Sequence, residues 1–227
     1  MSREPKPSGT VVVLRDGADL EILLLQRAAR DGKAGPWVFP GGKVEAGDRR
    51  AGAEPVDDAR RASVRETREE AGLDLAPERL VSISRWITPE IAPRRFDAWF
   101  FLAQADADAP VRVDGAEMCD HRWLAPARAL EAHHCSELRL APPTFVTVCW
   151  LAGFRDSASA LRVWEARAPI AFHPRITRTD DGPCMLYPGD AGYEAGDPGC
   201  AGPRHRLWAR KERWLYEWDE LPGDGAA

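Results

Sequence analysis

The sequence has no long run of apolar residues. Over 227 residues, 44% are hydrophobic and 30% are charged, and no segment approaches the roughly 20 apolar residues that span a bilayer. The first residues, MSREPKPSG, are polar and do not include the apolar stretch of a secretion signal. We therefore expect a cytoplasmic globular protein with no membrane partner, long enough for one full domain and an appendage.

Lysines are few, and the cysteines form no Cys-x-x-Cys motif. Lysine occurs at only four positions, so the basic charge is nearly all arginine, which suits bidentate contacts to phosphate. A net charge of -5 argues against general nucleic-acid binding. The five cysteines include no Cys-x-x-Cys pair, which predicts reduced thiols. A zinc cluster is imaginable, but its spacing matches no standard zinc pattern; its members would be Cys119, His121, His133, His134 and Cys135.

The first half of the chain reads as strands followed by one helix. GTVVVL and LEILLLQR are apolar runs joined by a loop with Asp16 and Gly17, which predicts a hairpin. A short strand ends at Pro40, and residues 49–56 are rich in Gly, Ala, Pro and charge, so we expect a surface loop there. Asp57 or Asp58 would then cap a helix that runs to Ala71, with Gly72 as the residue after its end.

The second half of the chain changes from predicted strands to predicted helices and then to a segment rich in Gly, Asp and Pro. Strands are predicted at 80–87, 96–103 and 118–124, and helices at 126–134, 142–154 and 157–166. Beyond Arg167 the chain is rich in Gly, Asp and Pro and ends with a predicted hairpin over 205–218. We therefore expect a main domain over 8–166 and a small β-rich extension over 167–227.

Three glutamates occur within five residues near the end of the predicted long helix. At 100° per residue, Glu66, Glu69 and Glu70 fall within roughly a 100° arc, so their carboxylates crowd one side. One interpretation is a solvated face in which Arg65 pairs with Glu69. The other is a site for Mg²⁺, which prefers carboxylate and phosphate oxygens. The helix alone does not decide between them.

The order of these residues resembles the Nudix box, a pattern of Gly, five residues, Glu, seven residues, and then Arg-Glu-apolar-x-Glu-Glu-x-Gly-apolar. The matching residues are Gly42, Arg65, Glu66, Glu69, Glu70, Gly72 and Leu73. The sequence departs from the box in three ways: Asp48 replaces its first Glu, Thr67 replaces an apolar residue, and 16 residues (49–64) separate Asp48 from Arg65. The resemblance implies an α/β/α sandwich around a mixed sheet, of the α+β class, and hydrolysis of a nucleoside diphosphate linked to another group.

A second resemblance points to one branch of that family. LLLQRAARDGKAGPWVFPGG is similar to the signature before the box of coenzyme A diphosphatases, in its aliphatic run, Arg27, Ala28 and the segment from Gly35 to Gly42. The spacing from Arg27 to Phe39 is one residue short, and Gly32 stands near where the signature has Arg. The long insertion, RWITPEIAPRRFDAWFF and LAPPT are similar to the group of the mammalian peroxisomal coenzyme A diphosphatase.

The resemblance implies a set of site residues. Glu66, Glu69 and Glu70 would hold Mg²⁺ or Mn²⁺, and Arg65 would brace Glu69. Asp48 would support the metal or Arg65 if the loop returns it to the site. Glu117 is our candidate general base, with Asp120 second. The expected substrate contacts are Arg27, Arg94, Arg95 and the backbone of Gly41 and Gly42, while Trp37 and Trp99 either stack on an adenine or belong to the core.

Several alternatives stay open at this point. The substrate is most simply coenzyme A or an acyl-coenzyme A, but ADP-ribose, a dinucleotide or a capped nucleotide fits the box equally well. A non-catalytic ligand sensor is the second alternative, and the intact glutamates argue against it. The extension over 167–227 carries no chemical signal; it could cover the site, recognise substrate or make a homodimer contact.

Overall fold

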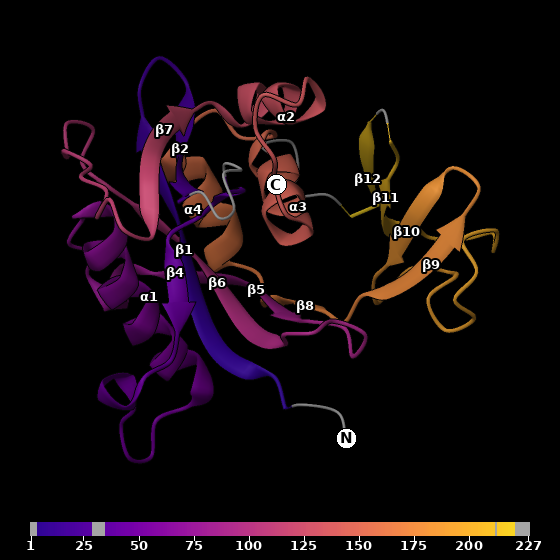
Figure 1. Cartoon of the computed structure of the whole chain (residues 1–227), viewed down its shortest axis with the longest axis horizontal. Coiled ribbons are helices and arrows are strands. Elements are labelled where there is room, and N and C mark those ends of the chain that lie inside the picture. The colour runs from indigo at the N-terminus through magenta and orange to yellow at the C-terminus, as the bar shows by residue number, and fades with distance from the viewer. Residues whose placement is uncertain (1–3, 29–34, 212, 221–227) are drawn as a thin grey trace.

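The structure is a computed structural model that describes residues 4–28, 35–211 and 213–220 (Figure 1). Its centre is an eight-stranded mixed sheet with the order β3-β2-β1-β6-β5-β8, to which β4 is added beside β1 and β7 beside β2. Pairing is parallel between β1 and β6 and between β5 and β8. The strands are β1 (Lys6–Asp16), β2 (Leu20–Arg27), β3 (Trp37–Val38), β4 (Gly41–Lys43), β5 (Val81–Ile87), β6 (Phe96–Gln104), β7 (Met118–Leu124) and β8 (Ile170–Phe172).

The alternation of side chains along β1 produces a layer on each side of the sheet. Val11 and Val13 belong to a buried cluster with the alanines of α1 (Pro55–Ala71). Val12 and Leu14 point the other way, into the core formed with α2 (Pro126–His134), α3 (Pro142–Leu151) and α4 (Ser157–Glu165). The predicted α/β/α sandwich around a mixed sheet is therefore confirmed.

Helix α1 begins earlier than predicted. It starts at Pro55 after Glu54, because proline at the first helical position has a suitable φ and needs no hydrogen bond for its missing N–H. The prediction that the loop continues to residue 56 and that Asp57 or Asp58 caps the helix is wrong. The end is as predicted: α1 stops at Ala71, and Gly72 has a φ of 69° with its N–H bonded to Arg68 O.

The other predicted elements are present. The hairpin of β1 and β2, the strands β5, β6 and β7, and the three later helices lie where the sequence places them, although α3 ends at Leu151 rather than near 154. The glycines after Pro40 form β4, which pairs with β1. In the described part of the chain no helix is both long and apolar enough to cross a membrane.

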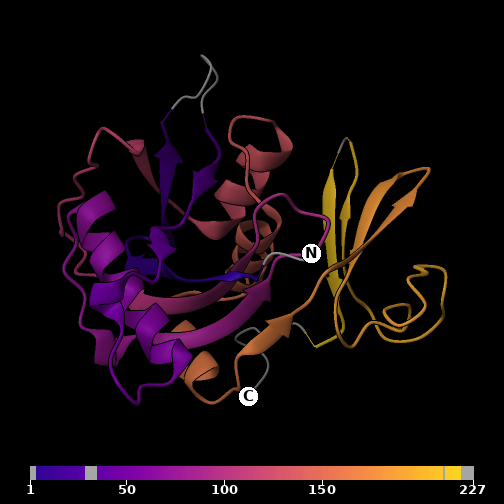
Figure 2. The same cartoon turned by 60° about the horizontal axis from the view of Figure 1, so that its bottom comes forward.

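The C-terminal residues form a four-stranded antiparallel sheet in the order β12-β11-β10-β9 (Figure 2). Its strands are β9 (Arg175–Thr179), β10 (Gly182–Leu186), β11 (His205–Ala209) and β12 (Trp214–Trp218), and the last two are the predicted terminal hairpin. The segment before this sheet, β8, pairs with β5 and completes the main sheet. Side chains of β10, β11 and β12 also pack against the core that contains α3 and α4.

Candidate active site

The end of α1 places the three glutamates in different environments. Glu70 is buried, with 3% of its surface exposed, whereas the side chain of Glu69 is 58% exposed and that of Glu66 is intermediate. Thr67, at the box position of an apolar residue, is fully buried, and its hydroxyl donates to Ser63 O at 2.7 Å. The helix itself therefore satisfies this hydroxyl, and the departure from the box leaves no unpaired polar group.

Strand β4 brings the backbone against two of these carboxylates. The N–H of Gly41 donates to Glu70 Oε2 at 2.9 Å. The carboxylate of Glu66 lies so close to Gly42 that an added Cβ would be 2.1 Å from Glu66 Oε1. Glycine at 42 is thus required by the position of Glu66. The contact of this backbone with substrate remains a prediction.

Arg65 connects the segment before the insertion to the glutamates. Its Nε and Nη2 donate to the two carboxylate oxygens of Asp48 at 3.2 and 3.0 Å, and Nη2 also donates to Lys43 O at 3.1 Å. Its Nη1 lies 3.0 Å from Glu66 Oε1 and 2.9 Å from Glu69 Oε2. The insertion therefore returns Asp48 to Arg65, and Arg65 contacts Glu69 as the sequence led us to expect.

The pair of Arg65 and Asp48 is ionised and partly withdrawn from water. Burial alone would raise the pKa of Asp48, but hydrogen bonds from Arg65 and from a backbone N–H outweigh it and hold that pKa below its ordinary value. The hydrogen bond to Asp48, in turn, is the main cause that raises the pKa of Arg65. The guanidinium is thus a permanent positive charge beside Glu66 and Glu69.

The pKa values of Glu70 and Glu66 are raised, whereas that of Asp48 is lowered. Burial is the main cause that raises the pKa of Glu70 to about 7; the Gly41 N–H opposes it, and repulsion from Glu66 and Glu117 adds to it. Burial also raises the pKa of Glu66. Without a cation, these carboxylates therefore bear an electrostatic cost.

A pocket of about 880 Å³ opens at these glutamates. Its acidic side chains are Glu45, Glu66, Glu70 and Glu117. Its basic side chains are Arg27, Lys43, Arg94 and Arg139. Its apolar lining comes from Trp86, Phe96, Ala98, Phe100 and Pro143. Such a combination suits a phosphorylated molecule with an organic group attached.

The structure brings most, but not all, of the predicted residues to this pocket. Glu117, Arg27 and Arg94 line it together with Glu66 and Glu70. Glu69, Arg65 and Asp48, which are paired with one another through Arg65, are not among the described residues that line it.

Four other candidates are not among the described residues that line the pocket. Arg95 directs its Nε to Thr88 O at 3.1 Å, and Asp120 lies on β7. Trp37 is 2% exposed in the core, and Trp99 packs against the core beside α1. The core interpretation of both tryptophans therefore agrees with the structure.

The described side chains do not already form a metal site. Within residues 4–28, 35–211 and 213–220, no three His, Cys, Asp or Glu side chains are grouped closely enough to hold an ion. The imagined zinc cluster is therefore not formed. The carboxylates of Glu66, Glu70 and Glu117 are donors of the kind that Mg²⁺ takes, so the donor type fits, but closing a site requires these side chains to draw together or Glu69 to leave Arg65.

Sequence reasoning missed the apolar wall, two basic residues, Lys43 and Arg139, and the acidic residue Glu45. Alternation along β5 and β6 puts Trp86, Ala98 and Phe100 on one face of the sheet, but both faces are buried, so the pattern does not show which face holds the pocket. Arg139 comes from the connection between α2 and α3, where no local signal marks it.

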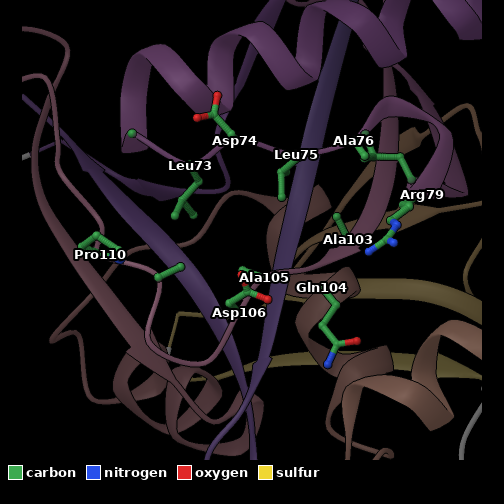
Figure 3. Close-up of a pocket in the computed structure, with 13 residues that line it drawn as sticks. Leu73, Asp74, Leu75, Ala76, Arg79, Ala103, Gln104, Ala105, Asp106 and Pro110 are labelled. Carbon is green, nitrogen blue, oxygen red and sulfur yellow. The ribbon is translucent and has the colours of Figure 1, made fainter.

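A smaller cavity, of about 340 Å³, lies at the C-terminal end of α1 (Figure 3). Its charged side chains are Asp74, Arg79 and Asp106. Its lining contains none of the predicted site residues, so the larger pocket is the candidate active site.

The fold and this site define an α/β/α sandwich protein whose acidic helix and glycine strand face a pocket lined by acidic, basic and apolar side chains. The sequence model of the NUDIX domain matches residues 5–145, more than half of the chain. The chain therefore belongs to the Nudix family and is classed as a diphosphohydrolase. Nudix hydrolases generally use a divalent metal ion such as Mg²⁺.

Known relatives agree with this assignment. Putative nudix hydrolase 7 of Caenorhabditis elegans is 23% identical over 223 residues, which cover 82% of this chain and 74% of the relative. Acyl-coenzyme A diphosphatase NUDT19 is 27% identical in Xenopus laevis and 30% in Gallus gallus, over 57% and 53% of this chain. The aligned part is 36% and 34% of those two proteins, about a third of their length.

Solved structures agree with the fold. A NUDIX hydrolase from Alicyclobacillus acidocaldarius superposes with a TM-score of 0.64 at 24% identity, over 74% of this chain and 100% of that one. The NUDIX domain of Shewanella oneidensis NrtR, solved with ADP ribose, gives a TM-score of 0.50 at 14% identity, over 64% and 85% of the two chains.

Proposed function

We propose that this protein hydrolyses the diphosphate bond of coenzyme A or an acyl-coenzyme A in the presence of Mg²⁺ or Mn²⁺. The observation that carries the proposal is the composition of the larger pocket. One end is formed by glutamates of the Nudix box, four basic side chains share the lining, and the remaining wall is apolar. Each part corresponds to a part of such a substrate and its cation.

The charge balance of the pocket supports the need for a cation. Four carboxylates and four basic side chains line it, so a phosphorylated ligand meets no net attraction from the lining as a whole and is repelled at the acidic end. A bound divalent cation would neutralise charge on the phosphate and make water there a better nucleophile.

The protein's own residues hold the acidic end in place. Arg65 fixes Glu66 and Glu69 from behind, and a backbone N–H orients Glu70. Glu117 is the proposed general base, which would accept a proton from the attacking water. Its support is that it lines the same pocket and raises the pKa of both Glu66 and Glu70 electrostatically, so the three carboxylates face one space.

The choice of coenzyme A has two further supports. Coenzyme A carries a 3′-phosphate in addition to its diphosphate, and the pocket has more basic side chains than a diphosphate alone requires. Two of the relatives are named acyl-coenzyme A diphosphatases. In the signature before the box, residues 29–34, including Gly32, lie outside the described residues.

The test is a panel of purified diphosphate compounds with Mg²⁺ or Mn²⁺ and products identified by mass. We expect coenzyme A or acetyl-coenzyme A to give adenosine 3′,5′-bisphosphate, and Glu66→Gln to lose this activity. Glu78→Gln, an exposed carboxylate on another element, is the matched control and should keep it.

Two outcomes would replace the proposal. If ADP-ribose, the compound bound by the NrtR domain, shows a kcat/KM a hundredfold higher, a gap of about 2.7 kcal/mol, the substrate assignment is wrong. Tight binding without cleavage of any compound would instead favour a sensor.

A further inference from the structure

One row of residues crosses the sheet from the acidic end of the pocket to the C-terminal segment. Paired positions on successive strands connect Lys43 to Ser8, Ser8 to Ala98, Ala98 to Trp86 and Trp86 to Phe172. All but Phe172 line the pocket. Strands lie about 4.8 Å apart, so Trp86 lies roughly 14 Å from β4, which contacts the catalytic glutamates.

Trp86 forms the far wall of the pocket in a particular way. Phe172 stacks on it with ring centroids 3.7 Å apart and planes within 4°. On the other side, the residue paired with Trp86 is Ala98, whose side chain is a single methyl group. Trp86 is 4% exposed, so it offers the pocket a narrow apolar strip rather than a broad ring face. A flat base would need such a face to stack on, whereas an aliphatic chain needs only the strip.

The C-terminal segment holds this wall from behind. Tyr187, which follows β10, is fully buried and meets the rings of Trp86 and Phe172 edge-on, at 5.6 and 4.8 Å between centroids. Its backbone is fixed by hydrogen bonds with His205 and Asp190. Asp190 in turn forms a fully buried ion pair with Arg206. The position of Trp86 thus depends on residues outside the matched domain, which ends at residue 145.

We propose that the C-terminal segment sets the width of the apolar end of the pocket, with Tyr187 as a positioning residue that acts through Phe172 on Trp86. The strip at Trp86 then contacts an extended aliphatic arm attached to the diphosphate. Because this rests on the proposed diphosphate hydrolysis, the test needs a readout besides activity.

The kinetic experiment compares coenzyme A, which carries a long aliphatic arm on its diphosphate, with ADP-ribose, which carries only a sugar there. For Tyr187→Leu, the KM for coenzyme A should rise about fivefold with kcat changed by less than about twofold, corresponding to ~1 kcal/mol of lost aromatic packing. The KM for ADP-ribose should stay within about twofold. Tyr193→Leu is the matched control: this tyrosine, on the same segment, donates to His173 O and lies outside the Trp86 cluster; it should change neither. An equal change for both substrates, or the same change in the control, would overturn the proposal.

The second arm uses ¹⁹F NMR of protein labelled with 5-fluorotryptophan, in which Trp86→Phe identifies one of the nine tryptophan signals. The Trp86 signal should move in Tyr187→Leu without ligand and stay in place in Tyr193→Leu. Coenzyme A added with Mg²⁺ should move it in the wild type, in spectra recorded before turnover is complete. An unmoved signal in both experiments overturns the proposal even if the enzyme is active, while loss of all hydrolysis with the expected shifts refutes only the proposed function.

Two further variants separate positioning from folding. Tyr187→Phe keeps the ring and removes a hydroxyl that is buried with no hydrogen-bond partner among the described residues; it should keep wild-type substrate preference. If Tyr187→Leu does not fold, Phe172→Leu removes the next ring and carries the same expectation. Failure of both to fold would show that the cluster is only structural and would overturn the proposal.

Discussion

Replacing Glu70 by glutamine should make the metal-free protein more stable at alkaline pH. Because the folded-state pKa of about 7 lies above the ordinary 4.5, the folded protein keeps a proton that the unfolded chain releases in this window. The unfolding free energy therefore falls as pH rises from about 4.5 to 7. At 1.36 kcal/mol per pKa unit, the full loss is ~3 kcal/mol at most. A neutral glutamine has no such loss, and its amide oxygen can still accept the Gly41 N–H.

The assay is thermal unfolding of both proteins in a chelator at pH 5 and pH 8. The Glu70→Gln variant should nearly match wild type at pH 5 and melt roughly 6–12 °C higher at pH 8. With Mg²⁺ at about a hundred times its Kd, wild type should regain ~2.7 kcal/mol and the variant little. Glu69→Gln is the control: its exposed side chain pairs with Arg65, so stability should change by less than ~1 kcal/mol at both pH values. A variant less stable at pH 8, or equally shifted at both pH values, would refute the reasoning.

Three other substitutions test separate parts of the account. Asp48→Asn removes the negative charge that accepts two hydrogen bonds from Arg65. The unfolding free energy, measured by denaturant titration, should fall by about 1–3 kcal/mol. The kcat, measured by turnover, should fall as well. Gly42→Ala places a Cβ against Glu66, a side chain that can swing away, so the metal-free melting temperature should change little while Mg²⁺ stabilises less. Arg206→Met leaves a buried carboxylate unpaired and should cost about 3–5 kcal/mol in chemical denaturation.

For each of these three predictions, one result would contradict the reasoning behind it. Unchanged stability in Asp48→Asn would mean that the returned loop does not brace Arg65. A full Mg²⁺ response in Gly42→Ala would mean that Glu66 is not a ligand. A neutral Arg206→Met would mean that the C-terminal ion pair is not buried in solution.

The sequence predicts local structure well where the local sequence alone determines the conformation. Gly72 ends α1 because the helix needs a left-handed residue there, and apolar alternation places β1, β5 and β6. The start of α1 was less predictable, since Pro55 and the aspartates that follow it are both valid start signals.

The candidate site was predictable only in its helix. Glu66 and Glu70 follow from helical spacing and the box. The contact of Asp48 with Arg65 spans 16 intervening residues (49–64), and the placement of Trp86 depends on pairing with β8, far along the chain. Such contacts arise from tertiary packing, which no local pattern encodes.

The central claim is that the pocket cleaves a diphosphate with a bound cation. The most direct test is incubation of the purified protein with coenzyme A and Mg²⁺ in ¹⁸O-labelled water, followed by mass analysis. The account predicts adenosine 3′,5′-bisphosphate and 4′-phosphopantetheine, with the label in one of the two phosphates that formed the diphosphate, and no products when a chelator replaces Mg²⁺. Intact coenzyme A after prolonged incubation, or unlabelled products, would contradict it.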